Sequence, residues 1–144
     1  MINSINDIKN FINDKSFKRI FILCGKKSFI SSGATNLAKN INPNQEIKLF
    51  YKKSEIPILE ELIEIIKEIR NFKPDLILAI GGGTIMDYAK IANVVDVRDD
   101  LKVLIENYSY PFQKRYTKLA VIPTTAGSGA EVTSNAVIYV NGIK

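Results

Sequence analysis

Short apolar runs alternate with segments of helical periodicity along this chain. Residues 19–24 and 75–80 are almost continuously apolar, which is typical of strands buried on both faces of a parallel sheet. Residues 46–51 and 118–122 are two further strand candidates. Apolar residues at helical spacing predict helices over 4–13, 29–41, 55–72 and 84–95. This alternation predicts an α/β fold that is Rossmann-like, with a mostly parallel sheet flanked by helices.

The clearest of these helices covers residues 55–72. Ser54 is expected to cap it, Pro57 fits the first turn, and Pro74 ends it. Its apolar stripe faces the core, whereas its charged residues are expected to face solvent; these are Glu60, Glu61, Glu64, Lys67 and Glu68.

The end of the sequence predicts a β-hairpin. A last strand is expected over 135–140, and Asn141-Gly142 is typical of a tight hairpin turn. Because the sequence continues only to Lys144, we expect this terminal hairpin to be cut short and the sequence to be incomplete. Residues 98–116 are polar and aromatic and predict a loop or a short helix.

The composition excludes several kinds of catalytic and metal-binding site. A chain of 144 residues, of which 46% are hydrophobic, suffices for one domain with an ordinary core. It contains no histidine and a single cysteine, Cys24, which excludes His-dependent catalytic sets, intramolecular disulfides and multi-cysteine zinc sites within it. A lone cysteine without a secretory signal favours a cytoplasmic location.

The basic excess of +5 is scattered along the chain. This scatter favours a solvated surface over a nucleic-acid-binding face. No apolar run approaches the roughly 20 residues that cross a bilayer, so no membrane partner is expected.

A glycine-rich turn follows the predicted strand over 75–80. Gly81, Gly82 and Gly83 let a ligand approach the backbone, and Thr84 opens a helix whose first N–H groups attract a diphosphate. A strand-to-helix turn without a ligand is the competing interpretation. The turn matches neither a P-loop nor the G-x-G-x-x-G fingerprint.

Further polar residues follow this turn. Asp87 and Lys90 share one helix face, as a surface ion pair or as ligand contacts. A second loop, 123–133, follows the strand over 118–122 and is dense in small hydrogen-bonding groups. Its hydroxyl-bearing candidates are Thr124, Thr125, Ser128 and Thr133.

These two segments resemble motifs of one family. Residues 81–90, GGGTIMDYAK, are similar to the Gly-Gly-Gly-Ser-x-x-Asp-x-Ala-Lys motif of the iron-containing (group III) alcohol dehydrogenases. Residues 123–133, PTTAGSGAEVT, resemble that family's Pro-Thr-Thr-Ala-Gly-Thr-Gly-Ser-Glu-Val-Thr loop. Thr84 and Ser128 keep the hydroxyl of the family pattern, whereas Ala130 loses one.

The resemblance implies a dinucleotide-binding enzyme. Residues 1–144 would form its N-terminal dinucleotide-binding domain, without the C-terminal helical domain. Gly81–Thr84 would hold the NAD(P) pyrophosphate, Asp87 and Lys90 would face the nicotinamide side, and the hydroxyls of 123–133 would line the cofactor. In the family, a divalent metal, iron or zinc, is held by one Asp and usually three His of the helical domain, so its ligands lie outside this sequence.

The expected cofactor is NADP(H) in preference to NAD(H). In this fold the loop after the first strand reaches the adenosine ribose, where NAD-preferring members tend to place an Asp. This sequence instead has Gly25, Lys26, Lys27 and Ser28. Solvated lysines without a ligand are the alternative.

The function expected of the full-length enzyme is metal-dependent hydride transfer between the nicotinamide and a small alcohol or aldehyde. The ending 137–144 resembles the phosphonoacetaldehyde reductase branch. The fragment alone is expected to be inactive, and a homodimer through domain edges is expected from the family. A stand-alone nucleotide-binding module without catalysis is the alternative function.

Overall fold

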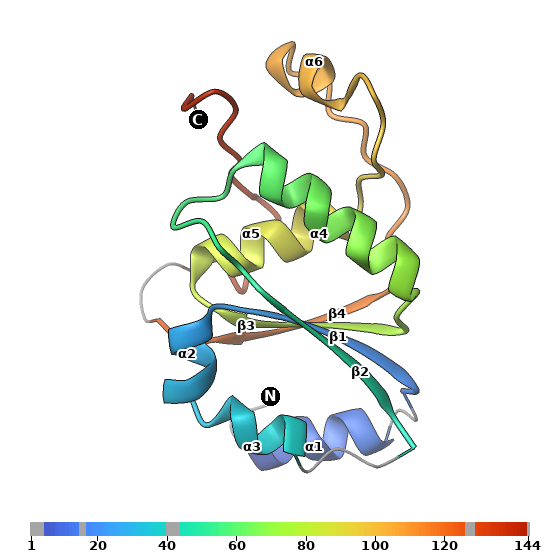
Figure 1. Cartoon of the computed structure of the whole chain (residues 1–144), viewed down its shortest axis with the longest axis vertical. Helices are drawn as coiled ribbons and strands as arrows, with labels where there is room; N and C mark the ends of the chain where they lie inside the picture. The colour runs from blue at the N-terminus through green and yellow to red at the C-terminus, as the bar shows by residue number, and fades with distance from the viewer. Residues whose placement is uncertain (1–4, 15–16, 40–43, 126–128, 144) are drawn as a thin grey trace.

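The structure is a computed structural model that describes residues 5–14, 17–39, 44–125 and 129–143. Its elements follow one another in an α/β order (Figure 1). The helices are α1 (Ile5–Asp14), α2 (Lys26–Ser31), α3 (Ala34–Lys39), α4 (Leu59–Phe72), α5 (Gly83–Ala92) and α6 (Leu101–Glu106). The strands are β1 (Arg19–Cys24), β2 (Glu46–Tyr51), β3 (Leu76–Gly81) and β4 (Lys118–Pro123).

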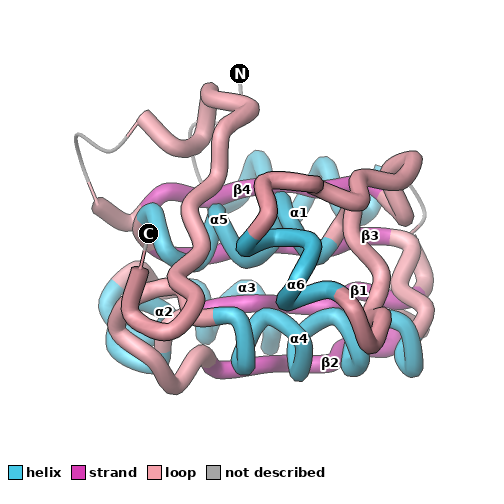
Figure 2. Tube along the Cα trace, turned by 90° about the horizontal axis from the view of Figure 1, so that it is seen from above, coloured by secondary structure: helices cyan, strands magenta, loops and turns pink. Residues whose placement is uncertain are grey.

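The strands form one sheet in the order β2-β1-β3-β4 (Figure 2). Each neighbouring pair is parallel, which confirms the predicted α/β class. Cys24 pairs with both Tyr51 and Ile80, and Gly81 pairs with Pro123, so the carboxyl ends of the strands are level. The strand order reverses between β1 and β3, the kind of position where open α/β sheets bind ligands.

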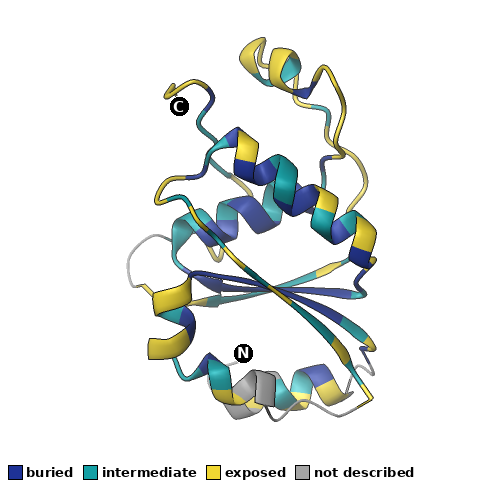
Figure 3. Cartoon of the chain, viewed as in Figure 1, coloured by how far each residue is buried: buried dark blue, intermediate teal, exposed yellow. Residues whose placement is uncertain are grey.

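Helices cover both faces of the sheet, which explains why β1 and β3 are apolar without alternation (Figure 3). Phe21 and Leu23 pack with α4 and α5 on one face. Ile20 and Ile22 pack with α1, α2 and α3 on the other. None of the described helices is long and apolar enough to cross a membrane.

Three predicted helices have other bounds in the structure. The helix expected over 84–95 is α5, which ends at Ala92. The helix expected over 29–41 is two helices, because Gly33 adopts a φ of 75° between α2 and α3. α2 already begins at Lys26, so most of the predicted loop 25–28 is its first turn. α4 begins at Leu59 after an extended Ile58, without a side-chain cap, so the prediction of Ser54 as its cap is wrong.

The strand predicted over 135–140 is also wrong, although the turn after it is confirmed. Asn141 and Gly142 have φ values of 52° and 79°, and Val140 and Ile143 exchange two 2.9 Å backbone hydrogen bonds around them. The segment before the turn leaves the sheet and crosses to the start of α4. There Tyr139 donates to the Pro57 carbonyl at 2.7 Å and accepts from the Leu59 amide at 3.1 Å.

Candidate functional site

The three-glycine turn links β3 to α5 beside the reversal of strand order. Gly82 caps α5 in an extended conformation, and its carbonyl accepts from Ile85 at 3.1 Å and Met86 at 3.3 Å. The N–H groups of Gly83 and Thr84 therefore precede the first hydrogen bonds of the helix. They carry the partial positive charge of a helix N-terminus, which suits an anionic ligand.

Two of these glycines are also required by packing. A Cβ on Gly81 would lie 2.6 Å from Ile85 Cγ1, and a Cβ on Gly82 would lie 2.9 Å from Thr125 Oγ1. The strand-to-helix turn itself therefore favours glycine at both positions, whether or not a ligand binds. The case for a ligand rests on the helix N-terminus and on the neighbouring loop rather than on the number of glycines.

The loop after β4 lies against the glycine turn. Thr124 donates its amide hydrogen to the Gly81 carbonyl at 3.0 Å, and Thr125 faces Gly82. The Thr124 hydroxyl oxygen is buried and has no hydrogen-bond partner among the described residues. A buried hydroxyl without a partner is costly, so this group calls for an explanation. Ser128, the third predicted hydroxyl of this loop, lies outside the described residues.

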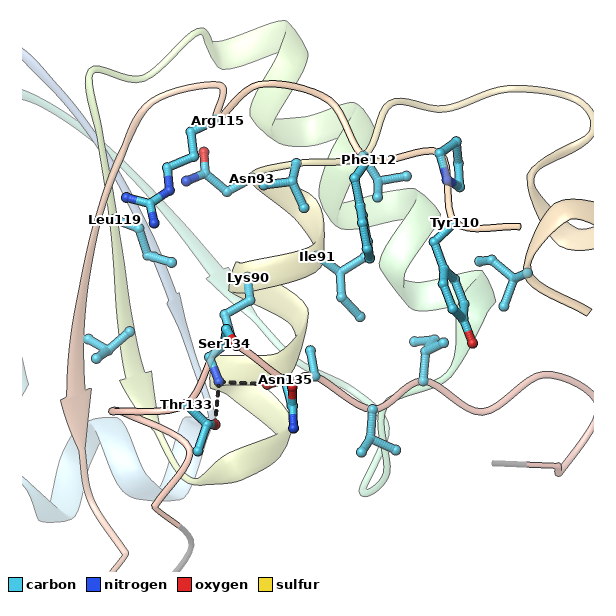
Figure 4. A pocket seen from close by; sticks show the side chains of 18 of the residues that line it. Lys90, Ile91, Asn93, Tyr110, Phe112, Arg115, Leu119, Thr133, Ser134 and Asn135 are labelled. Carbon is cyan, nitrogen blue, oxygen red and sulfur yellow. Dashed lines mark hydrogen bonds between the residues drawn. The ribbon is translucent and has the colours of Figure 1, made fainter. Parts of the chain in front are cut away.

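Lys90 joins α5 to the segment after the second loop (Figure 4). Its Nζ donates to Thr133 Oγ1 at 3.3 Å and to the Asn135 carbonyl at 2.8 Å. The structure thus brings together two predicted site residues, Lys90 and Thr133, that are 43 positions apart. Asp87, one helical turn before Lys90, is half-buried and engaged in its own interactions.

The loop after β1 presents two exposed lysines, Lys26 and Lys27, at the start of α2. Ser28 Oγ donates to the Gly25 carbonyl at 3.1 Å. Because β1 neighbours β3, this group lies on the same edge of the sheet as the glycine turn.

A buried polar cluster lies near this edge of the sheet, and it was not predicted from the sequence. Glu61 is only 4% exposed, so its assignment to the solvent face of its helix is wrong. Its carboxylate accepts from the amides of Lys53 at 2.5 Å and Ser54 at 3.0 Å and from the Tyr88 hydroxyl at 2.9 Å. Burial alone would raise the pKa of Glu61, but these hydrogen bonds prevail and lower it.

A groove of about 1490 Å³ lies beside α5 and β4 (Figure 4). Lys90 and Thr133 line one end, and the stacked rings of Tyr110 and Phe112 line another part. Neither the glycine turn nor the loop after β1 contributes to it. Most of the predicted site residues thus form two groups, one along the carboxyl edge of the sheet and one, Lys90 and Thr133, in the lining of this groove.

The described residues contain no group of His, Cys, Asp and Glu side chains that could hold a metal ion. With no histidine in the sequence, the residues present do not fit the metal centre that the resemblance implies.

Comparison with known sequences gives a consistent picture. The family model for iron-containing alcohol dehydrogenase matches residues 2–144. An alcohol dehydrogenase from Thermococcus barophilus is 32% identical over 138 residues, which are 90% of this chain and 36% of that protein. An NADPH-dependent butanol dehydrogenase from Clostridium saccharobutylicum is 32% identical over 98 residues, or 65% of this chain and 24% of the relative.

Solved structures show the same fold. An iron-containing alcohol dehydrogenase from Thermococcus thioreducens superposes with a TM-score of 0.72 at 24% identity, covering 99% of this chain and 39% of that one. A sulfoacetaldehyde reductase from Bifidobacterium kashiwanohense, solved with NAD+, gives a TM-score of 0.72 at 25% identity, covering 90% and 34%. The chain thus spans little more than a third of the length of these relatives. Its fold, its two motifs and the family match together show that the chain belongs to the iron-containing alcohol dehydrogenase family.

Proposed function

We propose that this chain binds a nicotinamide dinucleotide across the carboxyl ends of β1 and β3. It would serve as the nucleotide-binding part of an NAD(P)-dependent alcohol dehydrogenase or aldehyde reductase. The observation that carries the proposal is the meeting of two loops beside the N-terminus of α5. There the Thr124 amide donates to the Gly81 carbonyl, and the Thr124 hydroxyl has no partner among the residues that the structure describes. A dinucleotide pyrophosphate would satisfy both the N–H groups and the hydroxyl.

In this proposal, different residues bind different parts of the cofactor. Gly81–Thr84 would hold the pyrophosphate, and Thr124, Thr125 and Ser128 would line the dinucleotide. Lys90 and Thr133, with Asp87 on the same helix, would face the nicotinamide half. The bound dinucleotide supplies or accepts the hydride, and the protein groups orient it and exclude water.

NADP(H) is the proposed cofactor in preference to NAD(H). The structure has no carboxylate at Gly25, and Lys26, Lys27 and Ser28 follow it directly. Among the relatives, one is named as NADPH-dependent and another was solved with NAD+, so the family accommodates both.

The proposed substrate is a small alcohol or aldehyde, with phosphonoacetaldehyde as the candidate that the sequence of 137–144 suggests. Because the described residues offer no metal site, we propose that this chain alone reduces no aldehyde, even with added iron or zinc. Metal-dependent NADPH oxidation by the purified chain would contradict this point.

The binding proposal is tested by titration calorimetry of the chain with NADP+ and NAD+. Replacing Thr124 with Val removes the buried hydroxyl with little change in shape. The variant Thr124→Val should weaken NADP+ binding about tenfold while its free energy of unfolding stays equal or rises, because the Thr124 hydroxyl makes no hydrogen bond to the described part of the chain. Thr117→Val, just before the amino end of the same strand, is the matched control and should leave the affinity unchanged. Failure to bind either dinucleotide, or tighter binding of NAD+ by the wild-type chain, would overturn the corresponding part of the proposal.

A further inference from the structure

Lys52 extends from β2 over the end of β1. Its amide donates to the Cys24 carbonyl at 2.9 Å and continues the β1–β2 ladder one residue beyond Tyr51. Its Cε lies 3.9 Å from the position that a Cβ on Gly25 would occupy. The side chain that follows β2 therefore lies against the loop that follows β1.

The ammonium group of Lys52 is held in place by backbone carbonyls. Nζ donates to Ser54 at 2.6 Å and to Glu55 at 3.5 Å. The Glu55 carbonyl also accepts from Thr84 Oγ1 at 3.2 Å, which ties this segment to the first turn of α5. An ammonium has three N–H donors, and among the described residues two of those of Lys52 have acceptors, so the third could bind a ligand. The immobilised cation binds with little further loss of side-chain entropy.

The neighbouring lysine points to a different partner. Lys53 Nζ donates to both carboxylate oxygens of Glu64 on α4, at 2.6 and 2.8 Å. The adjacent pair Lys52-Lys53 thus divides into one lysine over the sheet edge and one paired with a surface acid.

We propose that Lys52, together with Ser28, binds the 2′-phosphate of NADP(H) above Gly25 and is the main determinant of cofactor preference. The inference rests on the proposed dinucleotide site and adds to it Lys52, the residue that directly follows β2. In dinucleotide-binding sheets, one strand leads into the phosphate loop, and the ribose is recognised at the end of the neighbouring strand. Here β3 leads into the glycine turn, and its neighbour is β1. Ser28 Oγ lies 2.8 Å from the same Cβ position on Gly25, so a hydroxyl and the end of the Lys52 side chain flank one spot. To donate to a phosphate there, the Ser28 hydroxyl would turn away from the Gly25 carbonyl, to which it donates at 3.1 Å. A phosphate there would receive charge-assisted hydrogen bonds, which the 2′-hydroxyl of NAD(H) cannot receive with equal strength.

The test compares ligands that differ only in the 2′-phosphate. Calorimetric titrations with NADP+, NAD+, 2′,5′-ADP and 5′-AMP are performed on the wild-type chain and on the variants Lys52→Met, Lys52→Arg and Lys53→Met. Lys52→Met should weaken NADP+ and 2′,5′-ADP about tenfold or more and change NAD+ and 5′-AMP by less than about twofold. Lys52→Arg should keep most of the preference, and Lys53→Met should keep all of it.

The outcomes separate this inference from the proposed function. Intact NAD+ binding by Lys52→Met shows that the variant is folded, so an unchanged ratio of NADP+ to NAD+ affinity overturns the role of Lys52 while the dinucleotide site stands. An equal loss of affinity for all four ligands would assign Lys52 a structural role and would also overturn its role in cofactor preference. Absence of binding to any of the four by the wild-type chain overturns the site and the inference with it.

Discussion

The Tyr88 hydroxyl donates a 2.9 Å hydrogen bond to the Glu61 carboxylate across the interface between α5 and α4. The same hydroxyl oxygen accepts from the Ile58 amide at 2.8 Å. Together the two side chains bind three amides of the segment that connects β2 to α4, those of Lys53, Ser54 and Ile58. This cluster fixes the segment that carries the carbonyl partners of Lys52 and Thr84.

Removal of the Tyr88 hydroxyl should destabilise the chain. The variant Tyr88→Phe leaves the Ile58 amide without its acceptor and removes a hydrogen bond from a buried carboxylate, so its free energy of unfolding should fall by about 1–3 kcal/mol in urea titrations. Combined with Glu61→Gln, the loss should be smaller than the sum of the single losses, with a coupling of about 0.5–3 kcal/mol. Strict additivity of the two substitutions would contradict a direct interaction.

Acid sensitivity should depend on Glu61. Burial opposes its charge, but the hydrogen bonds from Lys53, Ser54 and Tyr88 lower its pKa below the ordinary 4.5. A carboxyl group whose pKa falls on folding stabilises the protein above its unfolded pKa, and this stabilisation is lost as pH falls through the folded pKa. The free energy of unfolding should therefore decline below about pH 4.5 in the wild type and decline less steeply in Glu61→Gln. Urea unfolding between about pH 3 and 7 measures both slopes. Glu60→Gln, at an exposed position of the same helix, is the control, and identical slopes in all three proteins would contradict the prediction.

The four strands of the sheet were predictable to within one residue. β1 and β3 were the clearest, because a strand buried on both faces is a nearly continuous apolar run. The Glu61–Tyr88 pair could not be predicted, because its members lie 27 positions apart. Helical periodicity alone assigns an acidic residue to the solvent-exposed face. The segment 135–140 has a strand-like pattern, but Tyr139 pairs with the start of α4 rather than with the sheet. Tertiary contacts therefore determine the burial of Glu61 and the pairing of Tyr139, which the local sequence pattern does not reveal.

In the candidate site, too, some residues could be predicted from the local sequence and others could not. Its glycine turn and hydroxyl loop could be found from the sequence because their residues are contiguous. Lys52 could not, since its relation to Gly25 depends on the pairing of β1 with β2. A residue that lies over the end of a neighbouring strand carries no local sequence signal of that contact.

Lys73 offers a direct gain in stability. It follows α4 in the left-handed conformation, with a φ of 51°, which costs a side-chain-bearing residue about 1–2 kcal/mol and a glycine almost nothing. Lys73→Gly should raise the free energy of unfolding by about 0.5–1 kcal/mol, the remainder being offset by the greater flexibility of the unfolded chain. Lys67→Gly, the same substitution at an exposed position within α4, should lower it by about 1 kcal/mol. Equal signs for the two changes in urea titrations would contradict the role of the left-handed backbone.

Cys24 should be chemically silent in the folded chain. It ends β1 fully buried, and desolvation by burial raises the pKa of its thiol to about 12. The thiolate is the reactive form, so labelling by an aromatic disulfide reagent at pH 8 should be at least about a hundredfold slower in buffer than in urea. A cysteine placed on the exposed surface of α2 by Ser31→Cys, in a Cys24→Ala background, should react at nearly the same rate in both conditions. Labelling of the wild-type chain in buffer as fast as that of the surface cysteine would show that the end of β1 opens to solvent. The carboxyl edge of the sheet would then lack the rigidity that the proposed dinucleotide site requires.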